Sequence, residues 1–319
     1  MTLDYYRIFY YVAKYKSFSK AAQILGNNQP NITRYINLLE HELGCNLCVR
    51  THKGISLTPE GQLLYEHVEA AMYQLKNAQD ALKKNQSLES GTITIGVSDT
   101  ALRLYLSDKL ETFLSLYPNV RIKLTNNFTA QAITALEKGL VDFCIVTTPF
   151  SIDRAFTQNT LYTFEEILIG GRKYEHLADN ILNINDLSSY PYISLNEGSG
   201  SYSLYSEYFY NNHLHFEPEM LVYSTDQIMP LIRSNLGLAF YPEELATDEL
   251  NKGNIYNIKL NEPVPQRQVC LIQDTRRIQS IAVKRFLIYI YSTQTNNLHI
   301  MYKAAHVTGY TGGSLPSNK

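Results

Sequence analysis

Four polar side chains stand close together near the N-terminus, at Gln29, Asn31, Thr33 and Arg34. In the major groove of DNA, Gln and Asn can pair with adenine and Arg with guanine, and Thr can contact a phosphate or a thymine methyl group. Among them, apolar residues recur at intervals of four, three and four, at Ile32, Ile36, Leu39 and Leu43. This spacing predicts a helix that buries one apolar stripe and leaves its opposite, polar face free to read base edges.

The residues before this helix predict a second short helix and a tight turn. Residues 17–19 can cap a helix over residues 20–25, and Gly26 can adopt the left-handed conformation that ends it. Asn28 can cap the following helix, and Pro30 falls in its first turn, where a missing N–H costs little. Upstream, a first helix is predicted by apolar residues at every third position, Tyr6, Phe9 and Val12. Two short helices joined by such a turn form a helix-turn-helix, although an ordinary helical hairpin with a polar outer face would show the same pattern.

A short hairpin is predicted after these helices. Two apolar strands, residues 47–50 and 55–57, flank a turn that contains Gly54. Basic side chains gather around this turn, at Arg50, His52 and Lys53. After a helix-turn-helix such a hairpin would be a wing, whose basic residues reach phosphates or the minor groove.

Charge is unevenly distributed along the chain. Residues 1–58 hold seven basic and three acidic side chains, a formal charge of +4, whereas the other residues sum to −6. This asymmetry indicates that a basic N-terminal module binds a polyanion and that the rest of the chain does not. The composition, 45% apolar and 18% charged, is typical of a globular protein. No run approaches the ~18 apolar residues of a membrane span and no signal peptide is recognisable, so we expect a cytoplasmic protein without a membrane partner.

Together these residues resemble the LysR-type transcriptional regulators. The resemblance runs without a gap through the first sixty or so residues and continues more weakly to residue 292. It is carried by Ser17-Phe18-Ser19-Lys20-Ala21-Ala22, Leu25, Gln29-Pro30, Arg34, Ile36, Leu39-Glu40, Glu42-Leu43-Gly44, Leu47, Arg50 and Leu57-Thr58-Pro59-Glu60-Gly61. The resemblance implies a sequence-specific DNA-binding regulator controlled by a small-molecule effector, with an operator duplex and RNA polymerase as partners.

The resemblance also implies that the third helix reads the operator. The implied DNA-binding residues are Lys20, Gln29, Pro30, Asn31, Thr33, Arg34, Arg50 and Lys53. Two positions depart from the family pattern. Asn28 replaces the usual Ser, and because both residues cap helices we expect little change. Cys48 replaces the usual Phe, so we expect looser packing inside the wing.

A long amphipathic helix is predicted over residues 59–84. Its apolar residues repeat at alternating intervals of four and three, at Leu64, Val68, Ala71, Leu75, Ala78 and Leu82. This is the seam of a coiled-coil dimer, but it would also suit one helix lying on its own domain. Operators read by paired helices favour the dimer, and the resemblance implies a homodimer or homotetramer. The predicted domains are a winged helix-turn-helix at 1–58, a linker helix at 59–90, an effector domain at 91–292 and a polar tail at 293–319.

The effector domain is predicted to be an α/β body. Strands are expected at 92–97, 120–124, 142–146, 166–170, 192–195, 221–223, 238–241 and 269–272, and helices at 100–116, 131–138 and 280–291. The first five elements alternate as βαβαβ, which indicates a mainly parallel sheet. Ligands bind beyond the carboxyl ends of such strands, where Ser98 and Thr147 stand. Helix starts there suit a small anion such as a carboxylate, although most Ser and Thr residues at helix starts are plain caps.

The LysR-type effector domain is similar to the type II periplasmic binding proteins, whose two subdomains are crossed twice by the chain. The resemblance implies a first subdomain of residues 92–148 and 267–292 and a second of residues 149–266, with the effector between them. The implied effector-binding residues are Ser98, Thr100, Thr129, Thr147, Ser199 and Tyr202. The expected fold class is therefore α+β and multidomain, with no cofactor or metal and with a small polar or carboxylated metabolite as effector.

Other chemistry has less support in the sequence. Cys45 and Cys48 form a C-x-x-C, but no second such motif and no spaced His pair completes a zinc site, so two packed cysteines are expected. His213 and His215 lack a third ligand. Catalytic serine, phosphate-loop, dinucleotide and zinc-protease motifs are absent, so an enzyme is not expected. Three alternatives stay open: a receptor whose N-terminal part serves only assembly, a thiol or metal switch through the two cysteines, and an enzyme built on the α/β body.

Overall fold

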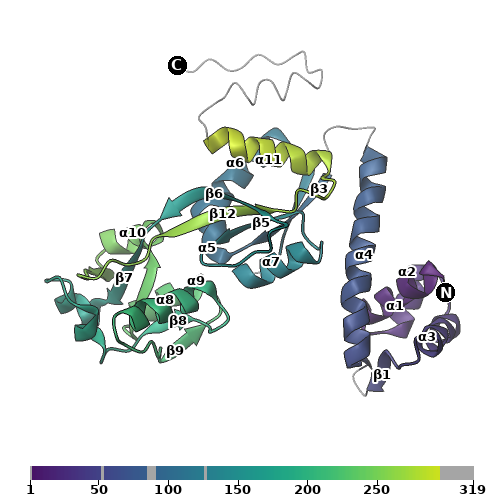
Figure 1. Ribbon diagram of the computed structural model, residues 1–319, viewed down its shortest axis with the longest axis horizontal. Helices are drawn as coiled ribbons and strands as arrows, with labels where there is room; N and C mark the ends of the chain where they lie inside the picture. Colours follow the sequence, from purple (N-terminus) through teal and green to yellow (C-terminus); the bar gives the residue numbers. More distant parts are fainter. Residues whose placement is uncertain (1, 52–53, 85–90, 126–127, 295–319) are drawn as a thin grey trace, which may run out of the picture. The chain divides into compact units, whose positions relative to one another are not determined.

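The computed structural model describes residues 2–51, 54–84, 91–125 and 128–294 (Figure 1). It divides the chain into two compact units, one built from the N-terminal helices and hairpin and one from the α/β body. Within the described residues, no helix combines the length and apolarity needed to cross a bilayer.

The N-terminal unit has the predicted helix-turn-helix and wing. Its first elements are α1 (Leu3–Tyr15), α2 (Phe18–Leu25), α3 (Gln29–Leu43), β1 (Cys48–Thr51) and β2 (Gly54–Leu57). Phe9, Val12, Ile36 and Leu39 are almost fully buried in one core beneath them. Leu43, which was expected in the buried stripe, is 38% exposed because it lies in the last turn of α3, beyond the core.

Two residues, the N-cap Thr58 and the glycine Gly61, position the long helix that follows, α4 (Pro59–Lys84). The Oγ1 atom of Thr58 accepts the backbone N–H of Gly61 at 2.9 Å, which pairs one of the free donors at the helix start. A Cβ atom on Gly61 would lie 2.0 Å from the carbonyl oxygen of Leu47. Because no side chain fits in that space, glycine is required for α4 to pack against the start of the wing.

The first half of the α/β unit is a five-stranded sheet covered by helices on both faces. Its strand order is β4-β3-β5-β12-β6, with β3 (Gly91–Val97), β4 (Val120–Thr125), β5 (Phe143–Thr147), β6 (Thr157–Phe164) and β12 (Arg267–Gln273). A continuous helical stretch with a π turn at its centre, α5 (Asp99–Ala101), η1 (Leu102–Leu106) and α6 (Ser107–Leu116), lies with α11 (Ile281–Gln294) on one face. Figure 1 shows α7 (Thr129–Glu137) on the other. Strands β4, β3 and β5 are parallel as predicted, whereas β12 is antiparallel to both β5 and β6.

The second half has a different sheet from the one predicted. Strands β7 (Glu166–Gly171), β10 (Leu238–Pro242) and β11 (Ile255–Ile258) are antiparallel, whereas the short strands β8 (Ile193–Leu195) and β9 (Met220–Val222) form a separate parallel pair. The helices of this half are η2 (Arg172–Leu177), η3 (Ile184–Leu187), α8 (Gly200–Asn211), α9 (Thr225–Arg233) and α10 (Glu243–Asn251). The expectation of a mainly parallel sheet is therefore right for the first three strands and wrong here.

Strand β6 also corrects the predicted subdomain boundary. The boundary at residue 149 places it in the second subdomain, but β6 pairs along its length with β12 in the first sheet. Its first four residues, 157–160, are all exposed and its sequence is mostly polar, so it carries no apolar run that would mark it as a strand. The chain therefore first crosses between the halves after Phe164, and it returns before Arg267.

Candidate DNA interface and effector cavity

Side-chain hydrogen bonds fix the start of α3. Asn28 is extended, and its Oδ1 atom accepts the backbone N–H of Asn31 at 2.9 Å, which confirms its predicted capping role. Asn31 Nδ2 donates to Asn27 Oδ1 at 3.1 Å. Ser19 Oγ of α2 donates to Gln29 Oε1 at 2.9 Å. These bonds orient the first turn of α3 before any partner binds, which lowers the entropy lost on binding.

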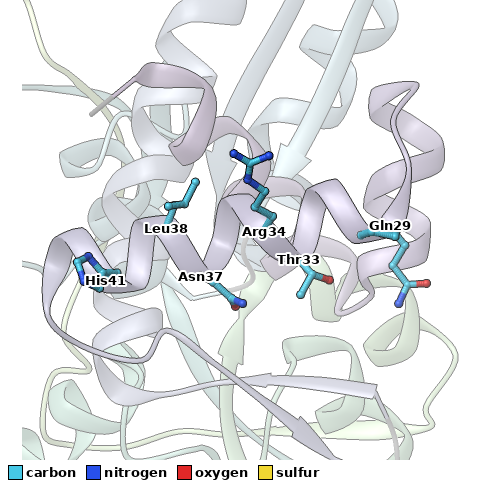
Figure 2. Close-up of a pocket in the computed structure, with 7 residues that line it drawn as sticks. Gln29, Thr33, Arg34, Asn37, Leu38 and His41 are labelled. Atoms are coloured by element: carbon cyan, nitrogen blue, oxygen red, sulfur yellow. The ribbon is translucent and has the colours of Figure 1, made fainter.

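The exposed face of α3 forms an open groove along the helix. It is lined by Gln29, Pro30, Thr33, Arg34, Asn37, Leu38 and His41. Figure 2 shows Gln29, Thr33 and Asn37 on the same side of α3, as expected for residues four apart. The groove thus unites four of the predicted DNA-binding residues. It also extends about two turns beyond them, to His41, which the apolar stripe alone could not reveal.

The remaining predicted DNA-binding residues lie outside this groove. Asn31 is half-buried and engaged with Asn27, as described above. Lys20 is exposed on α2, with its Nζ atom 6.0 Å from the ring centroid of Tyr15. Arg50 belongs to β1, but its side chain and the whole of Lys53 lie outside the described residues.

Cys45 and Cys48 both pack, partly buried, against the core of the N-terminal unit. Burial, helped by the nearby Glu40 carboxylate, raises the pKa of the Cys48 thiol to about 12. Such a thiol stays protonated at neutral pH, and the protonated form is neither a nucleophile nor a metal ligand. Glu40 Oε1 instead accepts the backbone N–H groups of Leu47 at 2.6 Å and of Cys48 at 3.0 Å, which fixes the start of the wing. Among the described residues, no group of three or more His, Cys, Asp or Glu side chains could hold a metal ion.

Four helical stretches begin around one cavity in the α/β unit, which we call the effector cavity. Ser98, Ser199 and Ser224 precede α5, α8 and α9, and Thr129 opens α7. A helix start carries a partial positive charge of about +0.5 and unpaired N–H groups. Because four helix N-termini point towards the same cavity, the cavity favours the binding of an anion. The cavity has a volume of about 20 Å³, which has room for a water molecule, so a larger ligand requires the two halves to separate.

Five of the six predicted effector-binding residues line the effector cavity. They are Ser98, Thr100, Thr129, Thr147 and Ser199, and each is at most 8% exposed. Ser98 Oγ is buried without a hydrogen-bond partner among the described residues. Leaving a buried hydroxyl unpaired costs about 1–3 kcal/mol, so a water molecule or a ligand group in the cavity would be stabilised by pairing with this atom.

Tyr202, the sixth predicted residue, does not line the effector cavity. Its backbone N–H donates to Ser199 Oγ at 3.1 Å, but its side chain turns away from the cavity. Its ring packs against Phe216, 5.8 Å away between centroids, in the core of the second half.

A buried ion pair whose arginine, Arg267, lines the effector cavity is absent from the sequence-based predictions. Arg267 Nη1 lies 2.9 Å from Glu166 Oε1, and neither residue is more than 6% exposed. Arg267 also donates to the Thr148 carbonyl oxygen at 2.7 Å and to Ser201 Oγ at 2.9 Å. The hydroxyl of Tyr205 donates to the other oxygen of Glu166. Burial and this carboxylate raise the pKa of Tyr205 well above 10, so the phenol stays protonated and remains a donor.

Contacts across the effector cavity hold the two halves together. Ser224 Oγ donates to Asp99 Oδ2 at 2.7 Å, and the hydroxyls of Thr100 and Thr225 lie 3.2 Å apart. Arg103 pairs with Asp226 and donates to the Tyr241 hydroxyl at 3.0 Å. Residues from the first turns of α5 and α9 thus meet directly over the cavity.

The predicted dimer seam divides into two parts along α4. Leu64 and Val68 pack on the core of their own N-terminal unit, so for these two positions the single-domain alternative is correct. Ala71, Leu75 and Ala78 are exposed, with Leu75 at 44%. The side chain of Leu82 lies outside the described residues.

Comparisons with known proteins match both units. Residues 3–62 match the model of the bacterial regulatory helix-turn-helix protein, lysR family, and residues 86–293 match the LysR substrate binding domain. A probable RuBisCO transcriptional regulator of Chlorokybus atmophyticus is 25% identical over 290 residues, covering 89% of this chain and 93% of that protein.

Solved structures share the fold over almost the whole chain. Full-length CbnR in complex with its target DNA aligns with a TM-score of 0.70 at 17% identity, covering 92% of this chain and 100% of that one. ArgP from Mycobacterium tuberculosis aligns with a TM-score of 0.69 at 16% identity, covering 92% and 98%. The chain therefore belongs to the LysR family of transcriptional regulators, with a DNA-binding helix-turn-helix domain and an effector-binding domain.

Proposed function

We propose that α3 reads the operator through the groove that runs along its exposed face. The observation that carries this proposal is the pairing of a buried apolar stripe with an opposite face of Gln29, Thr33, Arg34 and Asn37. These side chains carry hydrogen-bond donors and acceptors that can pair with the base edges exposed in the major groove of DNA. Pro30 and Asn31 shape the helix start. Lys20, Arg50 and Lys53 contact phosphates and position the helix.

We propose that the second half of α4 joins two copies of the chain. Ala71, Leu75 and Ala78 are exposed at heptad spacing beyond the part of α4 that packs on its own unit. Each protomer then supplies one recognition helix, as a two-fold operator requires. A tetramer would bring together four such helices. This arrangement supports the proposed domain order of winged helix-turn-helix at 1–58, linker at 59–90 and effector domain at 91–292.

Leu75→Asp is expected to disrupt the dimer and, with it, operator binding. Burying one leucine contributes about 1.5–3 kcal/mol, and each dimer loses two, so the dimer dissociation constant should rise at least about 100-fold. Sedimentation across a concentration series and a titration with duplex DNA measure the two effects. The matched control is Leu63→Asp, since Leu63 is 62% exposed on the same helix but outside the seam. If both variants sediment as wild type does, α4 is not the dimer contact.

We propose that the effector is a small carboxylate bound in the effector cavity. Four helix starts converge there, and Ser98, Thr129, Thr147 and Ser199 supply hydroxyl groups. Binding would separate the two halves and change their relative pose, shifting the population of assemblies that hold the operator. We propose that the protein acts in the cytoplasm and that RNA polymerase is a further partner. As a transcriptional regulator, it would not catalyse a reaction.

A further inference from the structure

Three consecutive residues at the start of α9 contact one side of the helical stretch formed by α5 and η1. The pairs are Asp99 with Ser224, Thr100 with Thr225, and Arg103 with Asp226. Each pair joins the first half of the α/β unit to the second, and we call the three pairs the latch. Because the three partners on α9 follow one another in a single helix start, we expect the pairs to form and break together.

Arg103 is the part of the latch that acts from outside the cavity. Asp99 and Ser224 line the effector cavity, whereas Arg103 and Asp226 do not. Arg103 Nη1 also donates to the hydroxyl of Tyr241 in β10 at 3.0 Å, so one guanidinium holds two elements of the second half. Tyr241 is almost fully buried in the core of that half. Arg103 therefore contacts a rigid part of the second half without contacting the cavity.

The latch has to break before the effector cavity can take a ligand. The cavity has room for a water molecule, so a larger ligand requires the halves to move apart. The chain crosses between the halves beside Glu166 and Arg267, at the starts of β7 and β12, and these crossings keep the halves connected. The contacts that separate are therefore the non-covalent ones over the cavity, as in other domain closures around ligands.

Building on the proposed function, we infer that Arg103 sets the affinity for the effector by holding the effector cavity closed. A ligand that binds only the open state has an apparent affinity reduced by the fraction of molecules that are closed. Removing the contacts of Arg103 raises the open fraction, so the effector should bind more tightly although no contact with it has changed. Arg103 is thus a positioning residue that acts through the pose of the two halves.

A thiol placed in the cavity measures its opening without any ligand. Ser98 is 5% exposed and its Oγ has no hydrogen-bond partner among the described residues, so Ser98→Cys removes no described side-chain bond. Iodoacetamide can alkylate the introduced thiol in the full chain when the halves separate, and mass spectrometry of the peptides gives the rate. The native thiol of Cys144 is the internal control. It is fully buried in β5, so it reacts only when the sheet itself opens.

Arg103→Ala, added to Ser98→Cys, is expected to speed alkylation of the cavity thiol by about 3- to 50-fold, the combined effect of one hydrogen bond and one partly exposed ion pair. Asp226→Ala should have a smaller effect, because Arg103 keeps its bond to Tyr241. The double variant should react no faster than Arg103→Ala alone, because the shared contact is lost only once. The matched control is Arg121→Ala, which removes an exposed arginine from β4 of the first half and should leave the rate unchanged.

Two results would overturn the latch. One is an equal rate for Arg103→Ala and Arg121→Ala. The other is an equal acceleration of the cavity thiol and of Cys144, which would mean that the whole unit loosens. Because the alkylation contains no ligand, either result leaves the carboxylate proposal standing.

Calorimetric titration with acetate then tests the link between the latch and the effector. Arg103→Ala should bind acetate more tightly than wild type, by about the factor that alkylation gives. An equal or weaker affinity would overturn the role of Arg103 in effector binding. If acetate binds to neither protein while the cavity thiol is accelerated, the carboxylate proposal fails and the latch stands.

Discussion

Arg34→Ala is expected to weaken sequence-specific operator binding strongly and to leave the protein folded and dimeric. Arg34 is exposed in the groove of α3 and contributes nothing to the core beneath it. A guanidinium that pairs with guanine discriminates against other bases by about 1–3 kcal/mol, and a dimer places two such groups on its operator. Specific affinity should fall by about 2–6 kcal/mol, or from roughly 30-fold to 10⁴-fold. A gel-shift titration with excess non-specific competitor measures this loss.

A matched variant separates base reading from the simple loss of a positive charge. Arg7 is also exposed, on α1, where it lies 3.7 Å from Asp4. Arg7→Ala removes the same charge without touching α3, so its specific affinity should remain close to wild type. Unchanged operator affinity for Arg34→Ala, or equal losses in both variants, would show that α3 does not read the operator through Arg34.

Glu166→Gln is expected to destabilise the α/β unit strongly. The substitution keeps the shape of the side chain but leaves the buried guanidinium of Arg267 without its counter-charge. Removing one partner of a buried ion pair costs about 3–5 kcal/mol, because the other charge stays desolvated. At about 2–4 °C per kcal/mol for a unit of this size, the thermal midpoint should fall by about 6–20 °C. Because Glu166 begins β7 and Arg267 begins β12, the pair joins the two segments where the chain crosses between halves.

The neighbouring glutamate provides the control for this prediction. Glu165 is exposed, so Glu165→Gln should change stability by no more than about 0.5 kcal/mol. Adding Arg267→Met to Glu166→Gln removes the unpaired charge and should restore most of the lost stability. A thermal midpoint of Glu166→Gln equal to that of Glu165→Gln would contradict the assigned importance of the pair.

The N-terminal unit was predictable because its structure is specified by neighbouring residues. The caps at Ser17, Asn28 and Thr58 lie within three residues of the N–H groups that they bind, and Gly26 ends α2 in the left-handed conformation. The apolar stripe of α3 then fixes which side is buried and which is free. Local signals of this kind are visible in a single sequence.

The effector domain was predictable only in part, because its main contacts join distant residues. Arg267 and Glu166 are 101 positions apart, and no sequence pattern near either residue predicts that they pair. Strand β6 has a mostly polar sequence, and it forms a strand because it pairs with β12. Tyr202 was expected at the cavity from the family resemblance, but its ring packs towards Phe216 in the second half. Five of the six cavity residues could be identified from the family resemblance because they stand at strand ends and helix starts.

Operator recognition by α3 is tested most directly by a gel-shift titration on the DNA immediately upstream of the protein's own gene. The titration includes excess non-specific competitor and a salt series. We expect a competitor-resistant complex whose affinity falls steeply as salt rises, because phosphate contacts release counterions. The absence of any complex, including a salt-sensitive non-specific one at low ionic strength, would contradict DNA binding by the N-terminal unit and would favour a receptor whose helices serve only assembly.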